Sequence, residues 1–324
     1  MKASAIRIHE TGGPEVMRWE EVDVPAPGAG EVTLKNHASG LNFIDTYQRS
    51  GLYKIPMPAV LGMEGAGTVE AVGEGVTEFK PGDRVAFGTV RGAYAEYVAA
   101  PVTQLVAIPE GVDFTQAAAA MLQGMTAHYL TQSTFPLKTG HTALVHASAG
   151  GTGRLIVQMA KLAGARVIGT AGSAAKAELA REAGADEVIL YNDVDFAAEA
   201  KRLTGGVGVD VVYDSVGQAT FQKSLDSLRP RGLMVSFGNA SGAVPAMEPL
   251  LLTQKGSLFL TRPMLAHHVA TRSDLEWRSG DVFQWIAEKD LVLRVEYTYK
   301  LADAAQAHRD LEGRKTTGKL VLVV

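Results

Sequence analysis

A glycine-rich loop is the feature that most constrains what this chain can fold into. Residues 147–153 read Ala-Ser-Ala-Gly-Gly-Thr-Gly and stand between an apolar run at 142–147 and a helical segment at 151–163. Small residues let such a loop turn tightly, admit a pyrophosphate to the backbone and bring the helix against the strand. A glycine-rich turn can be simple punctuation, but its place between a strand and a helix predicts a dinucleotide-binding site whose phosphates meet the helix N-terminus.

Strand and helix patterns alternate on both sides of this loop. We expect strands at 142–147, 166–171, 187–190, 209–213, 232–237 and 257–260, and helices at 115–132, 151–163, 174–183, 194–203 and 220–228. The strands are short apolar runs, as strands buried on both faces of a sheet are. This order predicts an α/β fold with a doubly wound parallel sheet of the Rossmann type.

The first 120 residues have a different, β-rich pattern. Short strands are expected at 31–35, 65–73, 84–87 and 94–98, with glycine and proline turns between them, as in a small barrel or sandwich. After helices at 281–289 and 301–312, the chain ends in a strand at 319–324, which needs a sheet to join. We therefore predict a discontinuous outer domain, 1–122 and 261–324, with a dinucleotide-binding domain inserted at 123–260.

Composition and charge exclude several classes of protein. The 324 residues include no cysteine, which rules out disulfides, thiolate zinc sites and cysteine nucleophiles. The formal net charge of −4 offers no basic surface for nucleic acid or anionic membranes, so neither is an expected partner. We also find no signal-peptide pattern and no apolar stretch near the ~20 residues of a membrane span. The chain is expected to be cytoplasmic.

The end of the second strand of the dinucleotide unit predicts which cofactor binds. A site for NAD usually has Asp or Glu there to bond the ribose 2′-hydroxyl. Here the strand ends Ala171-Gly172-Ser173, and the first carboxylate is Glu178. Lys176 is placed to meet a 2′-phosphate and Ser173 adds a hydroxyl, although Lys176 is alternatively a solvated helix residue. The pattern favours NADPH.

Two later loops, 214–217 and 237–242, follow the fourth and fifth strands of the same sheet. Ligands in such sheets lie beyond the carboxyl ends of the strands. These loops are candidates for flanking the ribose and nicotinamide, and ordinary Asp, Asn and Gly turns are the alternative.

Several segments together carry a more specific resemblance. They are 12–16, 42–47, 49–53, 82–85, 147–153, 212–217, 231–239 and 261–263. In these the chain resembles the zeta-crystallin-like quinone oxidoreductases, a zinc-free branch of the medium-chain dehydrogenases/reductases, over nearly its whole length. The resemblance implies a GroES-like outer domain, an inserted Rossmann domain and a cleft between them. It also implies NADPH-dependent reduction of quinones and a homodimer joined through the Rossmann sheets.

The resemblance also implies a set of site residues. The predicted cofactor contacts, together with Gly153 and Ser173 from the motif analysis, are Asn42, Thr126, Gly150, Gly151, Thr152, Lys176, Tyr191, Ser215, Phe237, Asn239, Ser241 and Arg262. Tyr47 and Tyr53 are predicted to line the quinone pocket. Asn42 and the two tyrosines are the candidates for orienting or protonating the reduced oxygen, with plain pocket lining as the alternative. Some relatives have a lysine where this chain has Gln123.

No metal site is predicted. Zinc relatives use cysteine and histidine ligands, and where a ligand histidine would precede a glutamate this chain reads Gly62-Met63-Glu64. We interpret Met63 and Glu64 as packing or pocket wall, and the eight histidines as structural.

The sequence therefore predicts a zinc-independent NADPH:quinone oxidoreductase that transfers hydride to a quinone in the interdomain cleft. One alternative is an NADPH-dependent reductase of α,β-unsaturated ketones or aldehydes. An alternative of another class is a non-catalytic NADPH-binding or RNA-binding protein.

Overall fold

The computed structural model describes residues 1–324 and divides into two compact units. Unit 1 comprises Met1–Met125, His268–Lys289 and Leu293–Val324, and unit 2 comprises Thr126–His267 and Asp290–Val292. The chain thus leaves unit 1, builds nearly all of unit 2 and returns. The domain boundaries at 122/123 and 260/261 stay a prediction.

Unit 2 is built on a six-stranded parallel sheet, as predicted. Its strands, in spatial order, are β11 (Glu187–Leu190), β10 (Arg166–Ala171), β9 (Thr142–Val145), β12 (Val209–Asp214), β13 (Leu228–Ser236) and β14 (Phe259–Thr261). The chain order reverses at β9, which lies between β10 and β12. In an open α/β sheet this reversal leaves a crevice beyond the carboxyl ends of the strands, where ligands bind.

Helices follow the strands of unit 2 in alternation. They are α3 (Gly151–Leu162), α4 (Ala174–Glu182), α5 (Phe196–Leu203), α6 (Phe221–Ser227) and the short α7 (Leu250–Gln254). Phe196 of α5 and Phe221 of α6 pack in one buried cluster with side chains from four central strands, among them Leu144 and Val212. Burial of this apolar surface holds the sheet and helices together.

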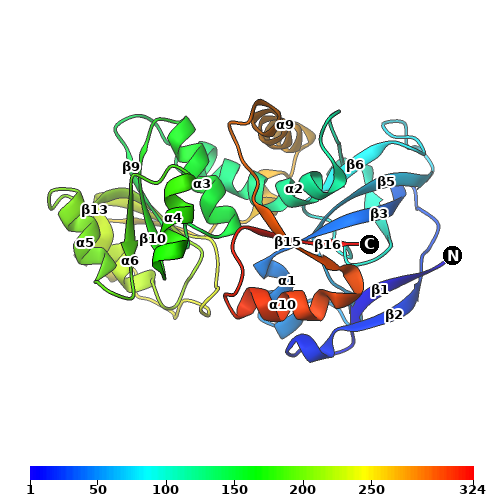
Figure 1. Ribbon diagram of the computed structural model, residues 1–324, viewed down its shortest axis with the longest axis horizontal. Coiled ribbons are helices and arrows are strands. Elements are labelled where there is room, and N and C mark those ends of the chain that lie inside the picture. Colours follow the sequence, from blue (N-terminus) through cyan, green and yellow to red (C-terminus); the bar gives the residue numbers. More distant parts are fainter. The chain divides into compact units, whose positions relative to one another are not determined.

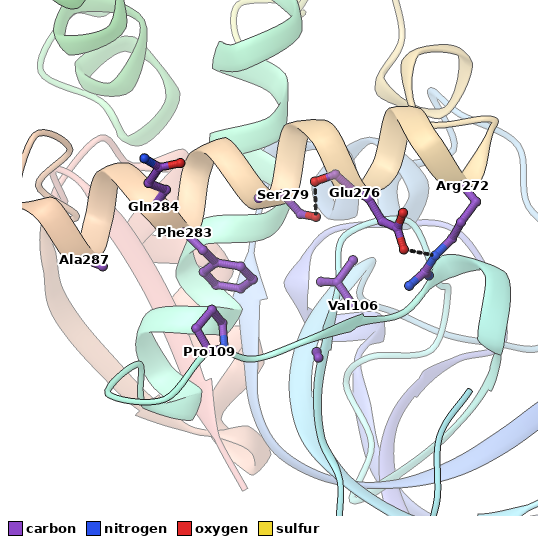
Figure 2. Close-up of a pocket in the computed structure, with 10 residues that line it drawn as sticks. Val106, Pro109, Arg272, Glu276, Ser279, Phe283, Gln284 and Ala287 are labelled. Carbon is purple, nitrogen blue, oxygen red and sulfur yellow. Dashed lines mark hydrogen bonds and ion pairs between the residues drawn. The ribbon is translucent and has the colours of Figure 1, made fainter. Parts of the chain in front are cut away.

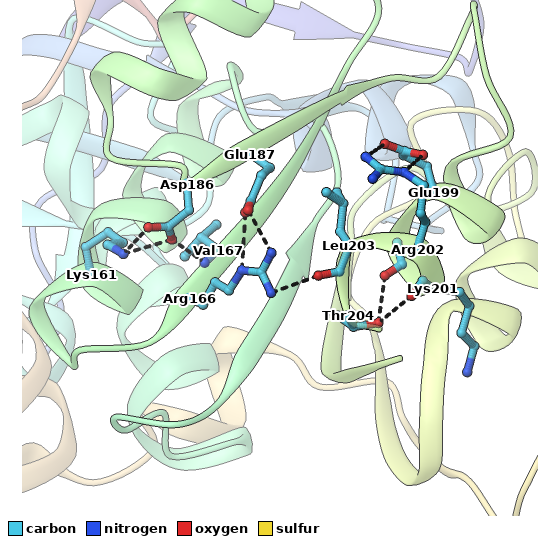
Figure 3. Close-up of polar contacts among 11 residues, drawn as sticks. Lys161, Arg166, Val167, Asp186, Glu187, Glu199, Lys201, Arg202, Leu203 and Thr204 are labelled. Atoms are coloured by element: carbon cyan, nitrogen blue, oxygen red, sulfur yellow. Dashed lines mark hydrogen bonds and ion pairs between the residues drawn. The ribbon is translucent and has the colours of Figure 1, made fainter. Parts of the chain in front are cut away.

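Polar contacts fix the register at the amino ends of β10 and β11. The Arg166 guanidinium donates to both carboxylate oxygens of Glu187, at 2.7 and 3.3 Å, and to the Leu203 carbonyl at 3.0 Å (Figure 3). Beside it, Asp186 accepts from Lys161 and from the backbone N–H of Val167. These contacts lie away from the carboxyl ends where the predicted site residues are found.

Unit 1 contains a seven-stranded sheet and a three-stranded sheet. The larger has the order β15 (Val295–Lys300), β16 (Lys319–Val323), β3 (Glu31–Leu41), β5 (Glu64–Val72), β6 (Arg84–Phe87), β8 (Val106–Ala107), with β7 (Tyr97–Pro101) also paired to β3. The smaller consists of β2 (Arg18–Asp23), β1 (Lys2–Ile8) and β4 (Ala59–Val60). Figure 1 shows β16, from the red end of the chain, beside the blue β3. The prediction that the last strand joins the N-terminal sheet is confirmed.

The helices of unit 1 differ from the prediction in two places. They are α1 (Phe43–Ser50), α9 (Arg272–Glu288), α10 (Ala304–Glu312) and the first part of α2 (Phe114–Tyr129). The end of α2, its continuation as a π-helical turn, η3 (Leu130–Thr134), and most of the short α8 (Leu265–His268) belong to unit 2. Helix α9 begins at Arg272 rather than at 281, because the Thr271 side chain accepts from the Asp274 N–H and caps an earlier start. Residues 301–303 form a 3₁₀ turn before α10. No helix in the structure combines the length and apolar character needed to cross a membrane.

Candidate cofactor and substrate sites

Helix α3 in unit 2 begins without a side-chain cap. Gly150 occupies the N-cap position and no side chain accepts from the first turn, whereas Ser173 caps α4 and Asp195 caps α5. The first N–H groups of a helix need acceptors and carry a partial positive charge. The N–H groups of Gly151 and Thr152 are therefore suited to an anionic ligand such as a pyrophosphate.

The third glycine of the loop is required by packing. A Cβ on Gly153 would overlap the backbone carbonyl oxygen of Ala147, which is not free to move because Gly150 N–H donates to it at 2.8 Å. Ala147 itself has a φ of 50°, in the left-handed region. The tight turn and the close approach of α3 to the end of β9 are those predicted from the motif.

The end of β10 brings three predicted residues together around Gly172. Ser173 caps α4 by accepting from the Lys176 N–H at 3.4 Å, so both lie in the first turn of that helix. A Cβ on Gly172 would lie 2.6 Å from the Tyr191 hydroxyl, so the tyrosine lies directly against this glycine. No carboxylate occupies the end of the strand, and a hydroxyl, an ammonium and a phenol suit a 2′-phosphate.

The loops after β12 and β13 are braced by Asp214, which is fully buried. One carboxylate oxygen accepts from the Val216 and Gly217 N–H groups, at 2.8 and 2.9 Å, and the Asp214 carbonyl accepts from the Phe237 N–H at 2.8 Å. The Ser241 hydroxyl donates to the Val216 carbonyl at 2.8 Å. Asp214 therefore fixes the loops that carry the predicted residues Ser215, Phe237, Asn239 and Ser241.

His146 directly follows β9, which ends at Val145, and is structural. Its ring nitrogens lie 3.0 Å from the Thr170 hydroxyl and 2.9 Å from the Ser224 hydroxyl, and burial lowers the pKa of the imidazole.

Two predicted cofactor residues of unit 2 remain, Thr126 and Arg262. Thr126 is buried on α2, and Arg262, just after β14, donates to the Ser236 carbonyl at 2.9 Å.

Asn42 in unit 1 belongs to a set of polar side chains, all buried except Gln123, which we call the Glu64 cluster: Asn42, Glu64, Gln123 and Lys319. The Asn42 amide nitrogen donates to Glu64 at 2.8 Å and to the Gly40 carbonyl at 3.2 Å. Its amide oxygen accepts from Gln123 at 3.1 Å and from the Lys319 ammonium at 2.8 Å. The residues come from the N-cap of α1, from β5, from α2 and from β16, so only folding brings them together.

An ion pair between Glu64 and Lys319 lies at the centre of the cluster, with side-chain exposures of 0% and 3%. The other Glu64 oxygen accepts from the backbone N–H of Leu122, on α2, at 2.6 Å. Gly40 makes room, because a Cβ there would overlap the Glu64 carboxylate. The interpretation of Glu64 as packing or pocket wall did not include this ion pair, because in the sequence Lys319 was marked only as part of a strand.

A second buried chain of contacts runs from Asp45 to the surface. Asp45 accepts from the Asn42 N–H at 2.8 Å and from the Tyr94 hydroxyl at 2.9 Å, and its other oxygen has no partner. Burial raises the pKa of Asp45 to about 7. His308 lies 3.4 Å from the Tyr94 hydroxyl, and burial together with the neighbouring guanidinium of Arg49 lowers the pKa of this histidine to about 3.

At the outer end of this series of contacts, Arg49 and Glu312 form a bidentate ion pair. Arg49 donates to the two carboxylate oxygens of Glu312 at 2.7 and 3.0 Å, and to His308 Nδ1 at 2.8 Å. A neutral His308 that accepts at Nδ1 carries its proton on Nε2, the atom that faces Tyr94. These residues fix α1 to α10, and none of them was predicted.

The two predicted pocket tyrosines lie together. The rings of Tyr47 and Tyr53 meet edge to face with centroids 5.3 Å apart, and Phe43 adds a third ring 6.1 Å from Tyr47. Edge-to-face pairs are a favoured aromatic geometry. Tyr47 is only 9% exposed. The three rings form an aromatic surface on and just after α1.

The predicted site residues do not line the pocket of about 420 Å³ in unit 1. Figure 2 shows that pocket between α9 and β8 with the residues that follow it, where Phe283 of α9 lies over Pro109. No group of three or more histidine, cysteine, aspartate or glutamate side chains in the structure could hold a metal ion.

Comparison with known proteins bears on both units. The family model "Alcohol dehydrogenase GroES-like domain" matches residues 28–110, and "Zinc-binding dehydrogenase" matches residues 151–274. A quinone oxidoreductase of Pseudomonas aeruginosa is 48% identical over 323 residues, covering 99% of each chain. The chain belongs to the quinone oxidoreductase family.

Other members of the medium-chain dehydrogenase/reductase superfamily are similar to this chain over nearly its full length. The crystal structure of Escherichia coli quinone oxidoreductase complexed with NADPH has a TM-score of 0.98 and is 44% identical, covering 99% of this chain and 100% of that one. A 2-haloacrylate reductase of Burkholderia is 43% identical and covers 98% of this chain and 97% of its own. The predicted resemblance and the predicted fold, a GroES-like domain with a Rossmann sheet, are confirmed.

Proposed function

We propose that this quinone oxidoreductase family member catalyses NADPH:quinone reduction without zinc. The observation that carries the proposal is full-length similarity to quinone oxidoreductases, one of them in complex with NADPH. It is supported by the uncapped start of α3 and by the acid-free end of β10. Bound NADPH would supply the hydride, and the protein's contribution is to bind, orient and exclude water.

We propose that the cofactor is held by residues of unit 2 together with Asn42. The N–H groups at 151–153 would hold the pyrophosphate beside Gly150, and Ser173, Lys176 and Tyr191 would hold the 2′-phosphate. Thr126, Ser215, Phe237, Asn239, Ser241 and Arg262 complete the proposed contact set. The fit rests on the uncapped α3 and on the Tyr191 hydroxyl, which lies against Gly172 at the end of β10.

The substrate is proposed to meet the aromatic surface of Phe43, Tyr47 and Tyr53, because flat rings stack on aromatic side chains. Reduction leaves negative charge on a quinone oxygen, which needs a hydrogen-bond donor or water. Asn42 and the two tyrosines are the predicted candidates. No strong general acid is required, because water can protonate a hydroquinone anion.

A second candidate function is reduction of α,β-unsaturated carbonyl compounds, which the similarity to a 2-haloacrylate reductase favours. Both reactions deliver hydride to a conjugated carbon. NADPH consumption with 1,2-naphthoquinone and with a simple enone separates them. We expect faster turnover of the quinone, and brisk enone turnover with undetectable quinone turnover would overturn the proposal.

NADPH binding without reduction of either the quinone or the enone would favour a non-catalytic NADPH-binding role. RNA binding that NADPH displaces would favour an RNA-binding role.

We further propose a homodimer joined through the Rossmann sheet. Strand β14 is an edge strand whose Phe259 and Leu260 are 61% and 38% exposed. An apolar edge with unpaired N–H and carbonyl groups is a template for pairing with another strand. Sedimentation should give a dimer for the native chain and a monomer for Phe259→Lys.

We also propose a cytoplasmic location. A chain without cysteine depends on no disulfide and so needs no oxidising compartment. Fractionation of the native cells should recover the protein with the cytosolic fraction, and recovery with membranes would contradict the proposal.

A further inference from the structure

The side-chain amide of Asn42 has no hydrogen-bonding capacity left. A primary amide offers two N–H donors and two acceptor lone pairs. Its donors bond Glu64 and the Gly40 carbonyl, and its oxygen accepts from Gln123 and Lys319. The residue is 4% exposed. A new bond from this amide to a substrate would break one of these four and leave a buried polar group unpaired, which is costly.

The Glu64–Lys319 pair also fixes which way the Asn42 amide points. Rotating the amide by half a turn would direct its NH₂ at the Lys319 ammonium and its carbonyl at the Glu64 carboxylate. Both ions are buried, so neither repulsion is relieved by water. The amide oxygen is therefore held towards Gln123.

Gln123 differs from Asn42 in having capacity to spare. Its nitrogen donates one hydrogen to the Asn42 oxygen at 3.1 Å, which leaves the second N–H and the amide oxygen. Gln123 is partly exposed, unlike the other members of the Glu64 cluster. Because its nitrogen is the atom tied to Asn42, the orientation of its amide is fixed in turn.

The helix that carries Gln123 is anchored on both sides of it. The preceding residue, Leu122, donates its N–H to Glu64 at 2.6 Å. The following residue, Gly124, packs closely on α9, since a Cβ there would lie 2.8 Å from a methyl carbon of Val282. A side chain held in this way loses little freedom on binding, which favours a substrate contact.

We infer that Gln123, rather than Asn42, donates the side-chain hydrogen bond to the quinone oxygen. Asn42, Glu64 and Lys319 are then positioning residues, which act by holding the Gln123 amide in place. The inference rests on the proposed function. The hydride and its two electrons pass to the quinone, one oxygen becomes anionic, and water supplies the proton that completes the hydroquinone. The Gln123 N–H bonds the anionic oxygen before that proton arrives. A glutamine amide carries no charge, so this donor is neutral.

The first test replaces the donor. Gln123→Leu keeps the approximate size of the side chain and removes both polar groups. We expect kcat/KM for 1,2-naphthoquinone to fall about 10- to 100-fold, the loss of a hydrogen bond to a charged group, with most of the fall in kcat. NADPH affinity and melting temperature should change little. The matched control is Gln116→Leu, on the exposed first turn of the same helix, which should leave kcat unchanged.

The second test asks whether the buried pair acts through Gln123. The double variant Glu64→Gln/Lys319→Met is neutral, so it leaves no unmatched charge in the core. It should lower kcat in the native background and have no further effect on kcat in the Gln123→Leu background. A merely structural role would lower kcat equally in both, and this outcome would overturn the positioning roles.

The outcomes separate the inference from the proposed function. If the native protein reduces 1,2-naphthoquinone and Gln123→Leu does so at the same rate, the inference is overturned and the proposed function stands. If the native protein binds NADPH but reduces no quinone, the proposed function fails and the inference fails with it.

Discussion

The two units build their candidate sites in different ways. In unit 2, the start of α3 offers uncapped backbone N–H groups at consecutive residues, 151–153, and a glycine at 153 that lets the chain come close. In unit 1, the Glu64 cluster uses side chains from positions 42, 64, 123 and 319, which the sheet and α2 bring together. The first kind of site is encoded locally, and at Gly153 it leaves no room for a Cβ. The second depends on the matching of charges between distant residues.

The largest expected effect comes from breaking the ion pair between Glu64 and Lys319. Lys319→Met should destabilise the protein by about 3–5 kcal/mol, because it leaves the Glu64 carboxylate buried without its partner. Denaturant unfolding measures this directly. In Glu64→Gln/Lys319→Met most of the loss should be recovered. A loss below about 1 kcal/mol for Lys319→Met would mean that the ion pair does not hold unit 1 together.

The local site should fail by steric overlap instead. Gly153→Ala places a methyl group on the Ala147 carbonyl oxygen, so α3 must move away from β9. We expect NADPH affinity to fall about 100-fold, which is about 2.7 kcal/mol, in a fluorescence titration. The control is Gly280→Ala on α9, where the added methyl meets nothing within 4 Å. That change should stabilise the protein by about 0.5–1 kcal/mol. Unchanged NADPH affinity in Gly153→Ala would contradict the packing argument.

The next effect concerns pH and again unit 1. Burial raises the folded-state pKa of Asp45 to about 7, so the folded protein binds a proton that the unfolded chain releases near pH 4. The contribution of Asp45 to stability is full below pH 4 and is lost as the pH rises through 7. Between pH 5 and pH 7 the loss is about 2 kcal/mol.

Asp45→Asn removes this titration and keeps the shape of the side chain. The free energy of unfolding, measured by denaturant at pH 5 and pH 7, should therefore fall by about 2 kcal/mol less in the variant than in the native protein. Equal pH dependence of the two proteins would show that Asp45 does not titrate in this range.

The smallest effect tests the choice of cofactor in unit 2. Lys176→Ala should weaken NADPH binding about 10-fold and leave NADH binding unchanged, because only NADPH has the 2′-phosphate. The ratio of the two dissociation constants is the measurement. If the affinities for NADPH and NADH fall equally, Lys176 has a general role in holding α4 and does not discriminate between the two cofactors.

The contrast between the units also explains what the sequence could predict. The glycine loop, the parallel sheet and the empty carboxylate position at Ala171–Ser173 are local patterns, and the structure has them where they were expected. The pairing of β16 with β3 could be predicted because a terminal strand needs a sheet. The partnership of Glu64 with Lys319 could not, since nothing near either residue indicates the other.

Capping explains the remaining differences. Thr271 starts α9 earlier than the apolar pattern alone indicates, because a side-chain cap outweighs the weak periodicity of its first turns.

Gln123 stood out in the sequence only as a departure from the family pattern. Its place beside the Asn42 amide required the fold, and a buried asparagine with two charged partners is visible only in three dimensions.

The central claim is that this chain moves hydride from NADPH to a quinone. The most direct measurement is anaerobic product accounting, in which the purified native protein is mixed with NADPH and 1,2-naphthoquinone and both are followed to completion. We predict that one hydroquinone forms for each NADPH consumed. NADPH that binds but is not consumed, or consumption without hydroquinone, would contradict the claim.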